Sequence, residues 1–222
     1  MTKVVPAALT QTMRKALTPL EAAYAWTRAW RSHRPADRIY PVDCRAIARE
    51  LKADVVEEEF SDKFDAALLK SGEATAIVVN SKMSRGRKNF CIGHEIGHLL
   101  LHADRGDLQC SFDDLSDIAP HPKNIEQEAN LFAFTLLMPA DDFRAMLDAK
   151  TTSLMIANDI SARYDTSLTA TTLRMIELSD QALTAVLIKN GIVKWSVSRP
   201  GRGWAIPKQS LTTRGFAYYG SI

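Results

Sequence analysis

Two histidines four residues apart, in the segment His94-Glu95-Ile96-Gly97-His98, constrain this chain more than any other feature of its sequence. On an α-helix, residues so spaced lie about 40° apart around the axis and one turn apart along it, so both project from one face. Two imidazoles in this arrangement can occupy two corners of a zinc tetrahedron. Glu95 points about 100° away from His94, which makes it a poor third ligand but lets it reach a water bound to the metal. The spacing predicts a metal-binding helix over about residues 89–102.

The His-Glu-x-x-His pattern rarely arises by chance. With 5 histidines in 222 residues, and with the glutamate content of this chain, roughly 0.005 chance occurrences are expected. The competing interpretation is a structural helix whose two histidines are paired with carboxylates. The motif therefore needs support from elsewhere in the chain.

A second motif offers the third ligand that a catalytic zinc requires, and it lies on a helix predicted over residues 125–138. Glu126 and Glu128 are the candidates. We favour Glu126, because it is in line with the apolar Ala133 and so faces inward. Burial does not exclude Glu128, but we expect it to be a solvated charge. Asn130 follows Glu126 by four residues, where it can orient a ligating histidine.

Two further residues of the histidine helix have other expected roles. His102 lies four residues beyond His98 and shares its face. Three successive levels of one helix cannot surround a metal, so we do not expect His102 to be a ligand. Cys91 is expected to be a packed, small apolar residue. The chain has 3 cysteines, an odd number that does not suit a disulfide framework.

The two motifs together resemble the ImmA/IrrE metallopeptidases. The resemblance rests on residues 94–102, on Glu126-Gln127-Glu128-Ala129-Asn130 and on Leu136-Leu137-Met138-Pro139, and it covers roughly residues 41–180. It implies a reduced zincin fold in which Zn²⁺ is held by His94, His98 and Glu126. It also implies a protein substrate, because characterised members of the family cut repressors that carry an Xre-type helix-turn-helix. Such cleavage derepresses mobile-element or DNA-damage-response genes.

A zinc-dependent endopeptidase that cuts such a repressor is therefore our leading hypothesis. A second hypothesis is a regulator or toxin–antitoxin partner that binds an Xre-type protein without cutting it and uses zinc structurally. A third is a DNA-binding factor that uses the C-terminal tail. That tail, residues 181–222, contains 6 basic and no acidic side chains. The alternative role for it is to dock on the acidic middle of the chain itself.

Local signals predict an α+β chain. Thr18-Pro19-Leu20-Glu21 has the pattern of a capped helix start. The remaining pattern predicts helices over 19–33, 41–51, 125–138, 139–147, 153–164 and 167–179, strands over 55–60, 66–69 and 75–79, and a hairpin over 185–197 with an Asn190-Gly191 turn.

Three segments have further expected structures or roles. The strand over 75–79 is expected at an edge of the sheet, where an extended substrate segment can add a strand. Residues 81–88 are predicted to be a polar loop and 103–123 an irregular connection.

The predicted helices over 153–164 and 167–179 resemble a helix-turn-helix. Their basic residues are only Arg163 and Arg174, whereas a DNA-reading pair meets phosphates with several basic groups. We therefore interpret the pair as a packing or partner-docking element. Nucleic acid is a possible partner that we do not favour.

Composition and patterning suggest three regions and a soluble chain. We expect an N-terminal helical extension over 1–40, a metallopeptidase domain over 41–150, and a helix-turn-helix-like segment with a basic hairpin tail over 151–222. No apolar run approaches the roughly 20 residues of a membrane-spanning helix. We find no signal-peptide pattern and expect a cytoplasmic protein without a membrane partner.

Overall fold

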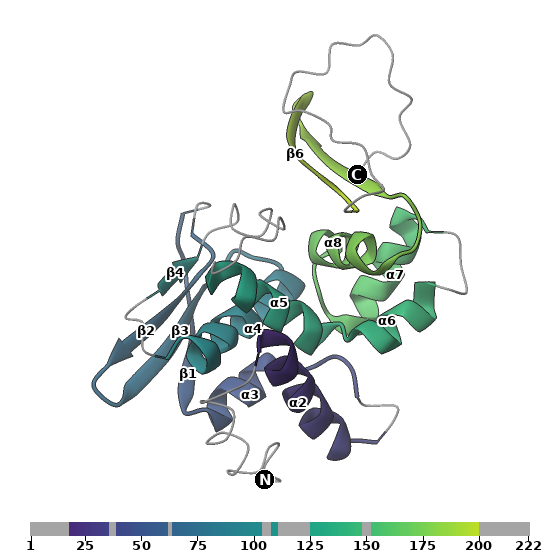
Figure 1. Ribbon diagram of the computed structural model, residues 1–222. Helices are drawn as coiled ribbons and strands as arrows, with labels where there is room; N and C mark the ends of the chain where they lie inside the picture. Colours follow the sequence, from purple (N-terminus) through teal and green to yellow (C-terminus); the bar gives the residue numbers. More distant parts are fainter. Residues whose placement is uncertain are drawn as a thin grey trace.

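A four-stranded sheet lies against the helix that carries the histidine motif (Figure 1). The computed structural model describes residues 18–35, 39–61, 64–103, 108–110, 125–147 and 152–199. The sheet has the order β1-β3-β2-β4, in which β1 runs parallel to β3 and the other neighbours are antiparallel. Its strands are β1 (Ala53–Glu58), β2 (Ala66–Ser71), β3 (Ala74–Asn80) and β4 (Leu108–Cys110). Together with the helices it forms the α+β fold that the sequence predicts.

The strand β3 lies inside the sheet, so the prediction of an edge strand over 75–79 is wrong. β1 pairs with one side of β3 and β2 with the other. Ile77 and Val79 are completely buried. The β-branched residues that indicate a strand here also suit a strand covered on both sides by neighbours. Within the described residues, the edges of the sheet are β1 and β4.

The histidine motif lies on α4 (Arg85–Leu101), which begins within the segment predicted to be a polar loop. Its first turn is basic, which the positive end of a helix dipole disfavours, so the sequence gives no helical signal there. The structure compensates these charges with acidic partners from three other segments. The ion pairs are Arg85 with Asp165 at 2.7 Å, Arg87 with Asp65 at 2.6 Å and Lys88 with Glu57 at 2.6 Å.

Close packing joins α4 to α5 (Ile125–Leu137), the helix that carries the second motif. Gly97 makes this approach possible. A Cβ atom added to Gly97 would lie 3.1 Å from the Cα of Ala129 and 3.3 Å from its carbonyl oxygen. These distances are too short for an ordinary side-chain contact with a backbone, so a larger residue would separate the helices.

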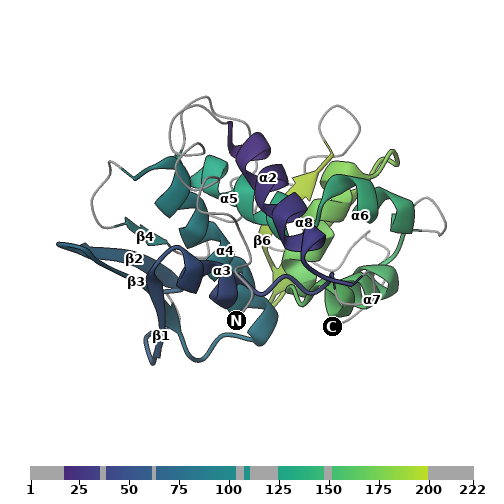
Figure 2. The same ribbon diagram turned by 90° about the horizontal axis from the view of Figure 1, so that it is seen from below.

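The N-terminal helix α2 (Pro19–Ser32) packs on α5, as Figure 2 shows. Thr18 and Glu21 form the predicted capping box. Trp26 is buried in the same core as the motif helices. The next helix, α3 (Cys44–Glu50), begins later than predicted, because the Asp43 side chain accepts a hydrogen bond from the Ala46 backbone N–H and caps it there.

The described residues after α5 form further helices and a hairpin beside them (Figure 1). The elements are α6 (Ala140–Leu147), α7 (Leu154–Tyr164), α8 (Leu168–Leu178), β5 (Thr184–Lys189) and β6 (Ile192–Ser198). Asn190 and Gly191 have φ angles of 54° and 70°, as a tight hairpin turn requires, so the predicted hairpin is confirmed. Most of the predicted basic tail, residues 200–222, lies outside the described residues.

Arg174 of α8 is buried rather than available to a phosphate. Its exposed fraction is 2%. The Nε–H donates to the carbonyl oxygen of Met138 at the end of α5, at 3.1 Å, and Nη1 pairs with Glu177 at 2.7 Å. A guanidinium at this position satisfies a helix C-terminal carbonyl and complements the helix dipole.

The segment predicted to be irregular over 103–123 contains β4, and the rest of it, apart from Ala103, lies outside the described residues. Among the helices that the structure describes, none has the length and apolar character needed to cross a membrane.

The close approach at Gly97 predicts a contrast between two glycines of α4. Gly97→Ala should lower the free energy of unfolding by about 1–2 kcal/mol, because overpacking against Ala129 outweighs the gain in helix propensity. Gly93→Ala should raise it by about 0.5–1 kcal/mol, because the nearest atom to an added Cβ is the Cys44 Sγ at 3.4 Å, an ordinary contact. Urea unfolding of both variants measures the difference, and equal stability of the two would contradict this packing.

Candidate metal centre

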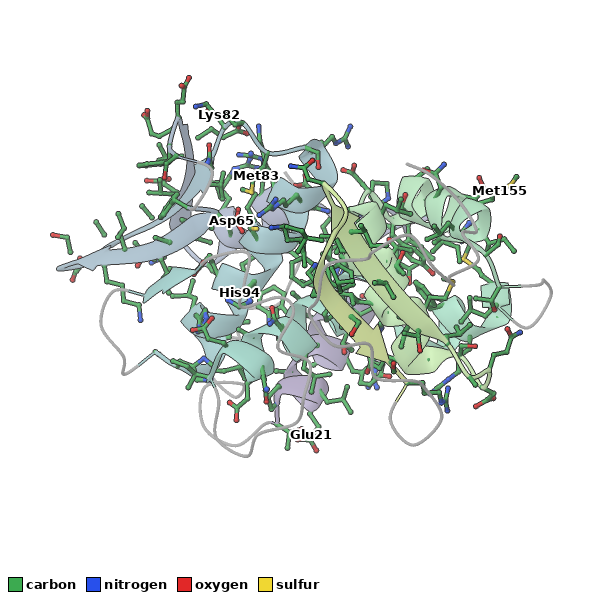
Figure 3. The ribbon with its side chains drawn as sticks, turned by 90° about the horizontal axis from the view of Figure 1, so that it is seen from above. Glu21, Asp65, Lys82, Met83, His94 and Met155 are labelled. Atoms are coloured by element: carbon green, nitrogen blue, oxygen red, sulfur yellow. The ribbon has the colours of Figure 1, made fainter. Side chains whose placement is uncertain are left out.

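Three side chains from two helices converge beside the sheet. His94 and His98 come from α4, and Glu126 comes from the first turn of α5. The Nε2 atoms of the histidines are 2.9 Å apart, and the Glu126 Oε2 lies 3.1 Å from the His94 Nε2 and 3.3 Å from the His98 Nε2. Among the described residues, these are the only three His, Cys, Asp or Glu side chains gathered closely enough to hold one metal ion. Figure 3 labels His94 among the surrounding side chains.

The spacing of these three atoms fits a tetrahedral ion. Ligands bound to zinc at about 2.0–2.1 Å stand about 3.3 Å from one another. The observed separations of 2.9, 3.1 and 3.3 Å approach that value. A single proton can bridge two of the three atoms but not all of them, whereas one cation can contact all three. Two imidazoles and one carboxylate are also the donor set of many catalytic zinc sites.

Asn130 fixes the orientation and the proton of His94. Its Oδ1 lies 2.9 Å from the His94 Nδ1. A carbonyl oxygen only accepts, so the Nδ1 carries the hydrogen and the Nε2 presents its lone pair to the cluster. The contact brings Asn130 to a histidine of the facing helix, whereas its expected role in orienting a metal ligand stays a prediction.

The charges in the cluster favour a cation between its donor atoms. Burial disfavours protonation of His94, yet the hydrogen bond with Glu126 and the charges of Glu95 and Glu126 raise the pKa of His94 above its ordinary value. Burial also acts to raise the pKa of Glu126, but its hydrogen bonds with His94 and His98 hold that pKa well below its usual range. For His98, burial dominates and lowers the pKa.

Glu95 is completely buried on α4 next to the cluster. Its charge acts on His94, whose pKa it raises. It is not one of the three side chains that converge. Glu95 is therefore a buried carboxylate next to the candidate ligands. It lies on the same helix as His94 and His98 but is not itself a candidate ligand.

Sequence reasoning missed the contact between His102 and Glu128. The His102 Nδ1 lies 3.1 Å from the His98 Nδ1, and the His102 Nε2 lies 2.9 Å from the Glu128 Oε2. The Glu128 side chain is 43% exposed, as a solvated charge is expected to be, and it also contacts His102. The four-residue spacing of His98 and His102 is the signal that indicates the contact between these two side chains.

Cys91 lies on the same helix and has the packed environment expected of it. It is a free thiol with an exposed fraction of 6%. Burial raises the pKa of the Cys91 thiol, which disfavours the thiolate that binds metals.

Comparison with known protein families finds a match. The family model of the M78 peptidases, described as the IrrE N-terminal-like domain, matches residues 48–175. A search of curated proteins finds no match. The matched segment contains α4 and α5 in full and therefore every side chain of the candidate metal centre. Because this match covers more than half of the 222 residues, the chain belongs to the M78 peptidase family, as its resemblance to the ImmA/IrrE metallopeptidases implies.

Proposed function

We propose that this protein is a zinc-dependent endopeptidase of the cytoplasm that cleaves a transcriptional repressor with an Xre-type helix-turn-helix. Cleavage would derepress mobile-element or stress-response genes. The observation that carries the proposal is the convergence of His94, His98 and Glu126 at 2.9–3.3 Å from one another, with Glu95 buried beside them.

In this proposal, His94, His98 and Glu126 hold the zinc ion. When bound, zinc supplies Lewis-acid activation of water and polarises the scissile carbonyl. Glu95 acts as the general base that takes a proton from the attacking water and then passes it to the leaving amine. Because Glu95 is buried, the local dielectric constant is low, which strengthens the electrostatic interactions of its carboxylate and of the zinc ion with the reacting groups.

The choice of a repressor substrate rests on the family and on the helical pair α7–α8. Membership in the M78 peptidases supports a protein substrate. A direct role on DNA is disfavoured, because Arg174, one of two basic residues in the pair, is buried against Met138. The pair then serves packing or partner docking rather than phosphate contact.

The metal site predicts how zinc content depends on Glu126. Purified wild-type protein should contain one zinc ion per chain. Glu126→Ala should weaken zinc binding by more than about 100-fold, because a direct metal ligand contributes more to zinc affinity than a hydrogen-bond partner of a ligand does. Elemental analysis after dialysis against a weak chelator measures this, with Glu73→Ala, an exposed acid in the β2–β3 turn, as the matched control. Equal zinc content in Glu126→Ala and wild type would exclude the proposed ligand set.

The role of Glu95 predicts a separation of metal binding from cleavage. Glu95→Gln should retain its zinc and lose about 10²–10⁴-fold in cleavage rate, because the amide cannot accept the proton. Mass spectrometry of a repressor encoded beside this gene, incubated with each variant, detects the products. Equal cleavage by wild type and Glu95→Gln would sink the mechanism. A stable complex with the repressor and no cut products from wild type would instead support a non-cleaving regulator.

A further inference from the structure

We propose that His102 and Glu128 are positioning residues of the metal centre, which act through His98. This inference rests on the proposed zinc site. The side chains form a chain of contacts that leads from the buried cluster to the surface. The His98 Nδ1 lies 3.1 Å from the His102 Nδ1, and the His102 Nε2 lies 2.9 Å from the Glu128 Oε2.

The direction of these hydrogen bonds follows from the requirement for a lone pair on His98. To bind a metal through Nε2, a neutral His98 must carry its hydrogen on Nδ1. That N–H then donates to the His102 Nδ1, which must be unprotonated. His102 therefore carries its own hydrogen on Nε2 and donates it to the Glu128 carboxylate, which only accepts. One arrangement of hydrogens satisfies all three residues.

Burial makes this series of hydrogen bonds from His98 to Glu128 necessary. His98 is completely buried and His102 is 8% exposed, so an Nδ1–H without an acceptor would carry the cost of an unsatisfied buried donor. Glu128 is 43% exposed at its side chain, so its charge remains solvated while it accepts from His102. The buried histidine is thereby coupled to a surface carboxylate without burying that charge.

The two candidate histidine ligands are supported differently. Asn130 offers His94 a neutral amide oxygen at 2.9 Å. His98 is supported by an imidazole that is itself polarised by a carboxylate. A hydrogen-bond acceptor behind a ligating histidine raises its basicity and holds its ring, and loss of such a partner typically costs 10–100-fold in metal affinity.

Two substitutions at His102 separate this role from a merely structural one. The Oδ1 of an asparagine side chain can occupy the place of an imidazole Nδ1, whereas a glutamine places its amide nearer the position of Nε2. His102→Gln should therefore weaken zinc binding about 10–100-fold, and His102→Asn should bind within about threefold of wild type. Competition with a chelating dye of known zinc affinity measures both.

Glu128 supplies an independent variant, because its side chain is half exposed and its replacement should not disturb folding. Glu128→Ala should weaken zinc binding about tenfold, and Glu128→Gln less, because the amide oxygen still accepts from His102. Glu73→Gln removes the same charge at an exposed turn and should bind zinc as wild type does.

Nitrogen-15 NMR of the zinc-loaded wild type should show the His98 hydrogen on Nδ1.

The possible failures are distinguishable. Wild type that binds no zinc overturns the proposed function and this inference with it. Zinc affinity that falls in Glu126→Ala but stays at the wild-type value in both His102→Gln and Glu128→Ala overturns this inference alone. Equal losses in His102→Asn and His102→Gln would contradict the acceptor role of Nδ1, as would a His98 hydrogen found on Nε2.

Discussion

The close contact between α4 and α5 at Gly97 and Ala129 is the constraint on which the candidate site depends. Each helix alone carries only part of the donor set: two histidines on one and a glutamate on the other. The backbone of Ala129 approaches Gly97 so closely that an added Cβ would lie 3.1 Å from its Cα. Because the two backbones approach so closely, the short side chains of histidine and glutamate can bring their donor atoms to about 3 Å from one another. The glycine inside the motif is therefore explained by packing, whereas the histidines are explained by chemistry.

The sequence predicts those parts of the structure whose signal is local. The capping box at Thr18, the Asn190-Gly191 turn and the histidine helix each follow from residues within a few positions of one another. The sequence favours Glu126 because it is in line with the apolar Ala133, and the Glu126 Oε2 lies 3.1 Å from the His94 Nε2. Elements with strong periodicity or a distinctive turn are thus recoverable without tertiary information.

The errors arise where partners distant in the sequence decide the outcome. The place of β3 inside the sheet depends on a parallel pairing with β1, which no local pattern reports. The first turn of α4 looks like a loop because its basic residues find their acids only in the folded chain. Glu128 keeps a side chain that is 43% exposed, but its contact with His102 at 2.9 Å is a partner that the sequence does not reveal. In each case the outcome depends on a tertiary contact, either a paired strand or a charged partner from another part of the chain.

The α7–α8 pair contacts both helices that carry the candidate metal centre, and the family match extends through most of this pair, to residue 175. The turn between α7 and α8 meets the beginning of α4, where Gly86 has no room for a Cβ because the Thr166 carbonyl group is within 2.6 Å of that position. The Asn89 side chain bonds to the Asp165 carbonyl oxygen at 3.4 Å. At the same end of the two helices, Arg174 donates to the Met138 carbonyl oxygen at the end of α5, and the Thr166 Oγ1 lies 3.7 Å from the Met138 Sδ. The helical pair thus contacts one end of each motif helix. These contacts give α7 and α8 a packing role within the chain, because the turn between them and the buried Arg174 are both engaged by the motif helices.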